Sequence, residues 1–149
     1  MIDGVVLTEL LRLPDERGTV MRMMRSSDPH FSRFGEVYFS SIHPGAIKAW
    51  HHHRHMTLNY AVPVGTIKLV LFDDRNNSPT KGVLQEIFIG ESNYQLVTIP
   101  SLIWNGFKCV GTKSALVANL TDVEHHNSGM TRKSPDDPYF GYDWAIRNR

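Results

Sequence analysis

Residues 45–65 read GAIKAWHHHRHMTLNYAVPVG, a histidine-rich segment bounded by two glycines. Side chains alternate between the two faces of a β-strand, so we expect His51, His53 and His55 to share one face. We expect His52 to point to the other face. Imidazole titrates near neutral pH and binds transition metals. The segment therefore indicates either acid–base catalysis or a metal site, with a solvated run of histidines as the alternative.

The chain on both sides of this segment has an all-β pattern. Short apolar runs rich in β-branched and aromatic residues alternate with turn-forming residues, as at 15–18 and 76–79. A series of about ten such strands with tight turns is typical of a sandwich or a jelly-roll barrel. The expected strands cover residues 2–7, 19–25, 36–42, 46–53, 57–62, 66–73, 83–89, 94–99, 103–109 and 114–120.

Length and charge favour one domain with a small-molecule partner. A chain of 149 residues can bury a sizeable core, so we expect a single domain over 1–149. Its core is expected at about 1–121, followed by an ordered but loop-like tail at 122–149. The 16 basic and 15 acidic residues give a net charge of +1, which argues against nucleic acid and membrane as partners.

The composition also predicts a cytoplasmic protein. The single cysteine, Cys109, excludes an intramolecular disulfide and fits a reducing compartment. Asp3, Glu9 and Arg12 interrupt the apolar positions of residues 1–13, which argues against a signal peptide or a membrane span.

The spacing of glycine and histidine indicates a particular kind of barrel. Gly45, His51 and His53 have the spacing of the first cupin signature, and Gly65 stands at the position where that signature ends. Metal-binding cupins carry a glutamate where this chain has Leu58 and a histidine where it has Asn105. Each replacement removes a ligand that a first-row metal needs for tight binding. We therefore expect no metal and no cofactor.

The chain resembles a metal-free cupin family, the dTDP-4-dehydrorhamnose 3,5-epimerases. The resemblance spans most of residues 3–121. It implies a cupin jelly roll, or double-stranded β-helix, that forms homodimers and binds a nucleotide-linked keto-sugar in the mouth of the barrel. The matching blocks lie within residues 15–18, 45–51, 74–82, 99–107 and 121–122.

The resemblance also implies roles for individual residues. His51 matches the base that removes a proton alpha to the C4 ketone of the sugar, a task that suits an imidazole. Arg17 matches an arginine that contacts the nucleotide diphosphate. Lys48 matches a basic residue three positions before the base. Alternation would place Lys48 on the opposite face from His51, so this match requires a local bulge.

Aromatic and amide side chains are further candidates for the pocket. Trp50 and Tyr60 lie on expected strands, where their rings could stack on a sugar or a base or simply fill the core. Asn105 holds the position of the histidine in the second cupin signature. We assign all three to substrate binding. The same two alternatives apply to Tyr38, Trp104 and Phe107.

The family's proton donor has no match in this chain. The family places a tyrosine just beyond a Thr-x pair, whereas residues 121–126 read TDVEHH. Glu124 or His125 is expected to substitute, provided that the environment adjusts its pKa. A lysine near the family's base is also missing, so enolate stabilisation has no assigned residue. Asp143 is the candidate for the aspartate that orients the base.

Three functions stay open. In the first, an isomerase with altered acid machinery acts on a dTDP-4-keto-6-deoxy sugar, with His51 as the base, and inverts one or two centres. In the second, a sugar 3,4-ketoisomerase uses His51 and His53 to move a proton between adjacent carbons. In the third, a cupin binds a sugar nucleotide or a weakly held metal without turnover. We expect the first.

Overall fold

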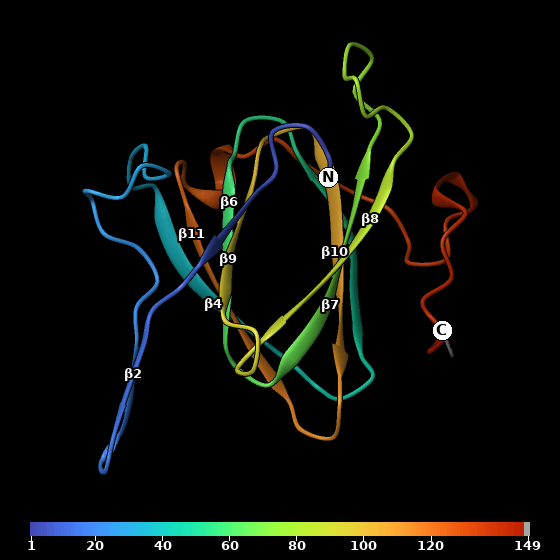
Figure 1. Ribbon diagram of the computed structural model, residues 1–149. Coiled ribbons are helices and arrows are strands. Elements are labelled where there is room, and N and C mark those ends of the chain that lie inside the picture. Colours follow the sequence, from blue (N-terminus) through green and yellow to red (C-terminus); the bar gives the residue numbers. More distant parts are fainter. Residues whose placement is uncertain (148–149) are drawn as a thin grey trace.

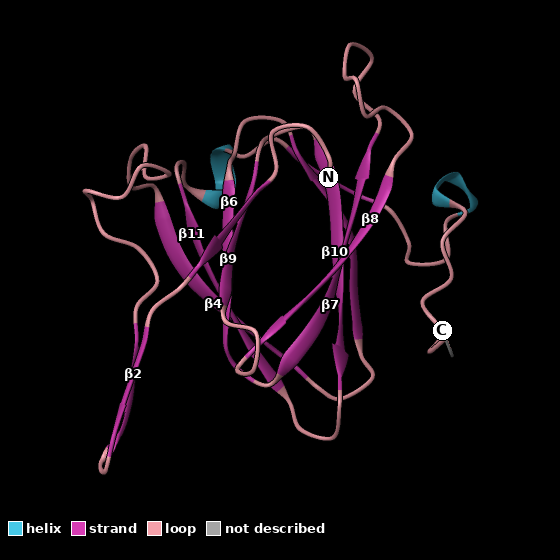
Figure 2. Ribbon diagram, viewed as in Figure 1, coloured by secondary structure: helices cyan, strands magenta, loops and turns pink. Residues whose placement is uncertain are grey.

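The computed structural model describes residues 1–147, and its regular structure is almost entirely β-strand (Figures 1 and 2). Two five-stranded sheets face each other across the molecule. In spatial order the first sheet contains β1 (Val6–Glu9), β9 (Gln95–Ile99), β6 (Leu58–Val64), β11 (Ala115–Thr121) and β4 (Glu36–Ile42). The second contains β12 (Met130–Arg132), β5 (Ile47–His53), β10 (Ile103–Val110), β7 (Thr66–Asp73) and β8 (Leu84–Gly90). This architecture confirms the predicted jelly roll.

The remaining elements lie outside the two sheets. A hairpin of β2 (Arg12–Asp15) and β3 (Gly18–Met21) extends away from the barrel (Figure 1). Two 3-10 helices, η1 (His125–Asn127) and η2 (Pro138–Phe140), follow β11 and lie on either side of β12 in the chain. Within residues 1–147 no helix is long and apolar enough to cross a membrane.

The core forms where the inward faces of the two sheets meet. On β7, Ile67, Leu69 and Leu71 alternate with outward residues and are fully buried, as the period of a strand requires. Leu58 on β6 belongs to the same cluster and is 2% exposed. The position where metal-binding cupins have a glutamate is therefore part of the apolar core.

The bulge that the sequence requires next to His51 is present in β5. Asn105 of β10 pairs with His51, and Phe107 pairs with Lys48, so β5 advances three residues while β10 advances two. Gly106 allows the close approach of the strands, because a Cβ atom there would lie 2.4 Å from the Cβ of Ala49. The extra residue turns Lys48 toward the same side of the sheet as His51.

The tail predicted to be loop-like contributes a strand to the barrel. β12 pairs antiparallel with β5, and Arg132 lies opposite His51. The sequence gives no sign of this short strand, because three residues are too few to show a period. In the structure it pairs backbone groups of β5 that would otherwise lie unpaired at the edge of the sheet. The tail is thus tied to the wall that carries the histidines.

Aromatic residues hold the rest of the tail against the outside of the second sheet. Trp50 is completely buried, and its ring stacks on Phe140 with centroids 4.1 Å apart. Trp144 lies 5.2 Å from Trp50, and its indole N–H donates to the carbonyl of Pro135. The outward face of β5 is therefore as buried as its inward face.

Candidate active site

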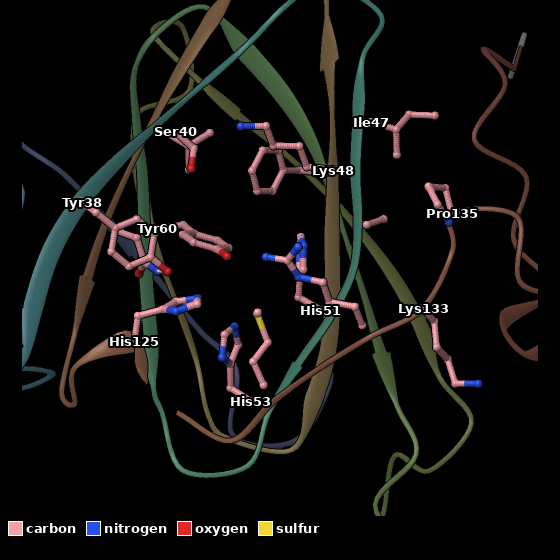
Figure 3. Close-up of a pocket in the computed structure, with 16 residues that line it drawn as sticks. Tyr38, Ser40, Ile47, Lys48, His51, His53, Tyr60, His125, Lys133 and Pro135 are labelled. Atoms are coloured by element: carbon pink, nitrogen blue, oxygen red, sulfur yellow. Dashed lines mark hydrogen bonds between the residues drawn. The ribbon is translucent and has the colours of Figure 1, made fainter. Parts of the chain in front are cut away.

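A cavity of about 590 Å³ opens between the two sheets, beside the histidine-rich strand (Figure 3). Strands β4, β6 and β11 form one wall, and β5, β10 and β12 form the other. The lining residues are Tyr38, Ser40, Ile47, Lys48, Ala49, His51, His53, Tyr60, Phe107, Val117, Asn119, His125, Met130, Arg132, Lys133 and Pro135. Imidazoles, cations and hydroxyl groups thus face one space.

Three imidazoles lie at this cavity. His51 and His53 come from β5, and His125 comes from η1, with its ring centroid 5.9 Å from that of His53. Burial, together with the nearby charges of Arg132, His125 and Lys48, lowers the pKa of His51 to about 4. Burial likewise lowers the pKa of His53 to about 4. Both rings are therefore neutral at physiological pH and able to accept a proton.

Cations surround His51 on its own wall. The Lys48 ammonium group donates to the carbonyl of Ser41 at 2.9 Å. Arg132 lies opposite His51 in the β12–β5 pair, whereas the Lys133 side chain points away from the histidines and its ammonium group pairs with Asp137 (Figure 3). Such a group of cations favours an anionic ligand and stabilises negative charge that develops on it.

Two amide side chains fix the tyrosines of the opposite wall. Asn105 donates to the carbonyl of His51 at 3.1 Å and accepts from the Tyr60 hydroxyl at 3.2 Å. Asn119 donates to the Tyr38 hydroxyl oxygen at 2.8 Å. Burial raises the pKa of both tyrosines, so both are protonated at neutral pH.

The structure brings together four of the residues predicted for the site. His51, His53, Lys48 and Tyr60 all line the cavity. Asn105 does not, because it is fully buried behind the wall, where it joins Tyr60 to the backbone of β5. Its prediction as a substrate contact is corrected to a position that supports the wall.

Trp50 and Arg17 lie away from the cavity. Trp50 faces the outside of the second sheet, because the residues on either side of it face inward, and the tail covers it. Arg17 is at the tip of the β2–β3 hairpin, where it pairs with Asp15 and its side chain is 90% exposed. Neither residue can contact a ligand bound in the cavity of its own chain.

The two predicted carboxylates are also outside the cavity. Glu124 is exposed and pairs with His126 at 3.4 Å, whereas the alternative, His125, points inward. Asp143 accepts from the backbone N–H of Ala145 on the outer tail and has no contact with His51. Glu124 therefore places no carboxylate in the cavity, and Asp143 does not orient His51.

The predicted histidine face ends sooner than strict alternation implies. β5 stops at His53, so His55 is exposed in the following turn. His52 points away from the cavity as expected, and its ring lies 4.8 Å from that of Trp104. Among residues 1–147, no three His, Cys, Asp or Glu side chains form an arrangement that could hold a metal ion.

Sequence reasoning missed the contribution of the tail. Arg132 and Lys133 line the cavity, but they lie in a segment with proline and glycine that shows no strand period. Their only signal is a pair of adjacent basic residues in an otherwise mixed tail. Tyr38 was named only as an aromatic candidate for the pocket, and Asn119 gave no signal beyond lying on an expected strand, because their pairing depends on how β4 and β11 align.

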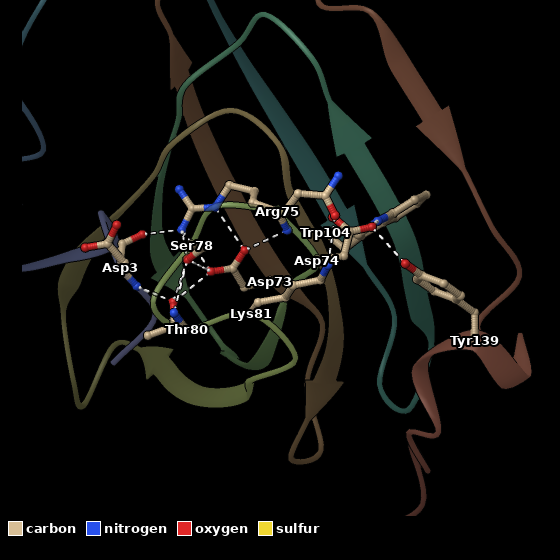
Figure 4. Close-up of polar contacts among 10 residues, drawn as sticks. Asp3, Asp73, Asp74, Arg75, Ser78, Thr80, Lys81, Trp104 and Tyr139 are labelled. Atoms are coloured by element: carbon tan, nitrogen blue, oxygen red, sulfur yellow. Dashed lines mark hydrogen bonds and ion pairs between the residues drawn. The ribbon is translucent and has the colours of Figure 1, made fainter.

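A second polar cluster occupies a loop at the end of β7 (Figure 4). The buried Asp73 accepts from Arg75, Ser78 and Thr80 at 2.9, 2.5 and 2.7 Å. Arg75 also donates to the backbone carbonyl of Asp3. This cluster explains why residues 74–82 form a recognisable block: they fasten the loop and the N-terminal segment together, away from the cavity.

Comparison with known proteins finds relatives that match this chain over nearly all of its length. The family model for dTDP-4-dehydrorhamnose 3,5-epimerase matches residues 1–149. The spore coat polysaccharide biosynthesis protein SpsL of Bacillus subtilis is 30% identical over 151 residues, which cover 100% of both chains. The probable low-salt glycan biosynthesis epimerase Agl13 of Haloferax volcanii is 34% identical over 148 residues, which cover 95% of this chain and 89% of that protein.

Solved structures share the architecture. A dTDP sugar isomerase from Desulfovibrio desulfuricans G20 is 43% identical and superimposes with a TM-score of 0.95, covering 99% of this chain and 94% of that one. A dTDP-4-dehydrorhamnose 3,5-epimerase from Sulfolobus tokodaii, at 23% identity, shares the fold with a TM-score of 0.83 over 97% of this chain and 83% of that one. The full-length match and the fold lead to one conclusion: the chain belongs to the dTDP-4-dehydrorhamnose 3,5-epimerase family.

Proposed function

We propose that the protein is an isomerase that removes a proton alpha to the ketone of a dTDP-4-keto-6-deoxy sugar, with His51 as the base. The observation that supports this most directly is a neutral imidazole, that of His51, which lines a cavity together with Lys48 and Arg132. A base for this reaction must be unprotonated before it acts, and the resulting enolate needs nearby positive charge.

The chemistry of the step follows from the ketone. The C–H bond alpha to the carbonyl breaks, its electron pair moves onto the ketone oxygen, and the proton passes to the imidazole of His51. A proton delivered to the opposite face of the same carbon then gives the inverted sugar. Lys48 and Arg132 provide positive charge for the diphosphate or the enolate oxygen, in place of the lysine missing near the base.

A second candidate is ketoisomerisation between neighbouring carbons. His51 and His53 line the same wall, and both are neutral at physiological pH, so a proton removed by one ring could return at the next carbon through the other. This reaction shares the first step with epimerisation and differs in where the proton returns.

Proton NMR in deuterated water tests this function. On incubation of dTDP-4-keto-6-deoxyglucose with the protein, we expect loss of the C3 signal, the C5 signal or both, because an abstracted proton is replaced by deuterium. Loss with inversion identifies epimerisation, and movement of the keto group identifies ketoisomerisation. Binding of the sugar nucleotide without exchange at either carbon would reject both reactions and leave a non-catalytic binding protein.

We also propose that the protein works as a homodimer in which the β2–β3 hairpin contacts a second copy. The hairpin extends away from its own barrel (Figure 1). Leu13 and Val20 on the hairpin, and Leu11 just before it, have exposed apolar side chains. In a dimer, Arg17 at its tip could reach the partner's cavity and its bound diphosphate.

Sedimentation equilibrium should give about twice the chain mass of 17.0 kDa, and Val20→Glu should shift the protein toward monomer. A wild-type monomer at micromolar concentration would contradict this proposal.

A further inference from the structure

We infer that Tyr38 is the proton donor that completes the reaction, an inference that depends on the proposed function. Inversion requires a donor on the face of the carbon opposite the base. Tyr38 lies on β4 in the first sheet, whereas His51 lies on β5 in the second. Figure 3 shows the two side chains on opposite sides of the cavity. The two walls thus offer a base and a hydroxyl donor to one bound sugar.

The hydrogen bonds around Asn119 leave the Tyr38 proton free for a ligand. The backbone N–H of Asn59 can only donate, and it lies 3.1 Å from the Asn119 side-chain oxygen. The Asn119 amide nitrogen must therefore face Tyr38, where it donates to the hydroxyl oxygen at 2.8 Å. Among residues 1–147, the structure gives the Tyr38 hydroxyl no acceptor for its own proton.

Tyr60 has the opposite arrangement, although it lines the same cavity. The carbonyl of His51 can only accept, so the Asn105 amide nitrogen faces it and the Asn105 oxygen faces Tyr60. The Tyr60 hydroxyl consequently donates to Asn105 at 3.2 Å. Its proton is used inside the wall, and it is therefore a poorer donor to a ligand than Tyr38.

The nearby imidazoles are less suited to this role. His53 is neutral at physiological pH because burial lowers its pKa to about 4, and it lies on the same strand as the base. His125 packs edge-on against the Tyr38 ring with centroids 5.9 Å apart. This contact places His125 beside the tyrosine, where it helps to hold the ring in position.

Asn119 also prepares Tyr38 for proton transfer. After His51 takes the alpha proton, the electron pair of the enolate forms a new C–H bond with the Tyr38 hydroxyl proton, which leaves a tyrosinate. The Asn119 N–H then faces a charged oxygen, and a hydrogen bond to an ionised acceptor is stronger than one to a neutral acceptor. The tyrosinate regains a proton from water, and His51 releases its proton to water.

Tyr38→Phe separates the two halves of the reaction. In deuterated water, we expect inversion to fall by about 100-fold or more, the usual contribution of a general acid. Exchange of the alpha proton should continue near the wild-type rate, because His51 can still remove it and return deuterium to the same face. Tyr94→Phe is the matched control, since Tyr94 is a buried tyrosine in a separate apolar cluster and should leave both rates unchanged.

A second variant keeps the tyrosine and reverses its hydrogen bond. Asn119→Asp offers Tyr38 an acceptor instead of a donor, so the hydroxyl proton should turn toward the carboxylate and inversion should again fall while exchange persists. The assignment would be overturned if Tyr38→Phe inverted the sugar as fast as the wild type. It would also be overturned if His125→Gln lost inversion while Tyr38→Phe kept it. Absence of exchange in the wild type would reject the proposed function and this assignment with it.

Discussion

Replacement of His51 with glutamine is expected to lower alpha-proton exchange by a factor of about 10² to 10⁴, the range that a general base contributes. Glutamine keeps a polar side chain of similar length but cannot accept the proton. His51 lines the cavity beside Lys48 and Arg132, and within residues 1–147 no aspartate or glutamate lines it. The NMR assay in deuterated water measures the exchange rate directly.

His55→Gln is the matched control for this experiment. His55 belongs to the same histidine run but lies exposed beyond the end of β5, so its replacement should leave exchange unchanged. Binding of dTDP to the His51→Gln protein should also remain measurable, since the cations of the cavity are intact. Wild-type exchange by His51→Gln would show that another group is the base.

The pH dependence of the wild-type rate provides a second readout for His51. The pKa of about 4 predicts that the acidic limb of kcat/KM, which reports the free enzyme, lies well below the value near 6.5 of an ordinary histidine. A bound diphosphate partly neutralises Lys48 and Arg132, whose charges lower that pKa. We therefore expect the acidic limb of kcat at higher pH than that of kcat/KM, and coincident limbs would contradict this coupling.

Trp50→Ala is expected to reduce the free energy of unfolding by about 3–5 kcal/mol, the usual cost of truncating a buried tryptophan. Trp50 has no exposed surface and contacts three rings of the tail: Phe140, Tyr142 and Trp144. For a chain of this length the melting temperature should fall by roughly 6–20 °C. Chemical and thermal denaturation followed by circular dichroism measure both quantities.

Phe34→Ala is the control, because Phe34 is 65% exposed and its truncation should change stability by less than about 0.5 kcal/mol. Loosening of the tail should also weaken dTDP binding in Trp50→Ala, since β12 carries Arg132 to the cavity. Unchanged melting and unchanged binding in Trp50→Ala would mean that the tail is held by other contacts.

The sequence predicted the barrel and the histidine wall because both depend on local patterns. Alternation along β5 placed His51 and His53 together, and the spacing to Lys48 required the bulge that the structure contains. Trp50 was misassigned because alternation defines two faces without saying which one meets a ligand. Both faces of β5 are covered, one by the cavity and the opposite sheet, the other by the aromatic tail.

Other parts of the site depend on contacts that no local pattern records. Arg132 reaches the cavity only because a three-residue strand of the tail pairs with β5. The orientation of Asn119, and with it the free proton of Tyr38, is set by the alignment of β11 with β4 and β6. Such features follow from the assembled sheets, and sequence spacing alone does not reveal them.

The pairing of β12 with β5 has an additional consequence for solubility. Without β12, β5 would be the outer strand of its sheet and would present a row of unpaired N–H and C=O groups to the solvent. Exposed edges of this kind invite pairing between molecules and lead to aggregation. The tail covers this edge and also the apolar face around Trp50. A chain that loses its tail would therefore expose an edge and an adjacent apolar surface together, the combination from which intermolecular β-structure grows.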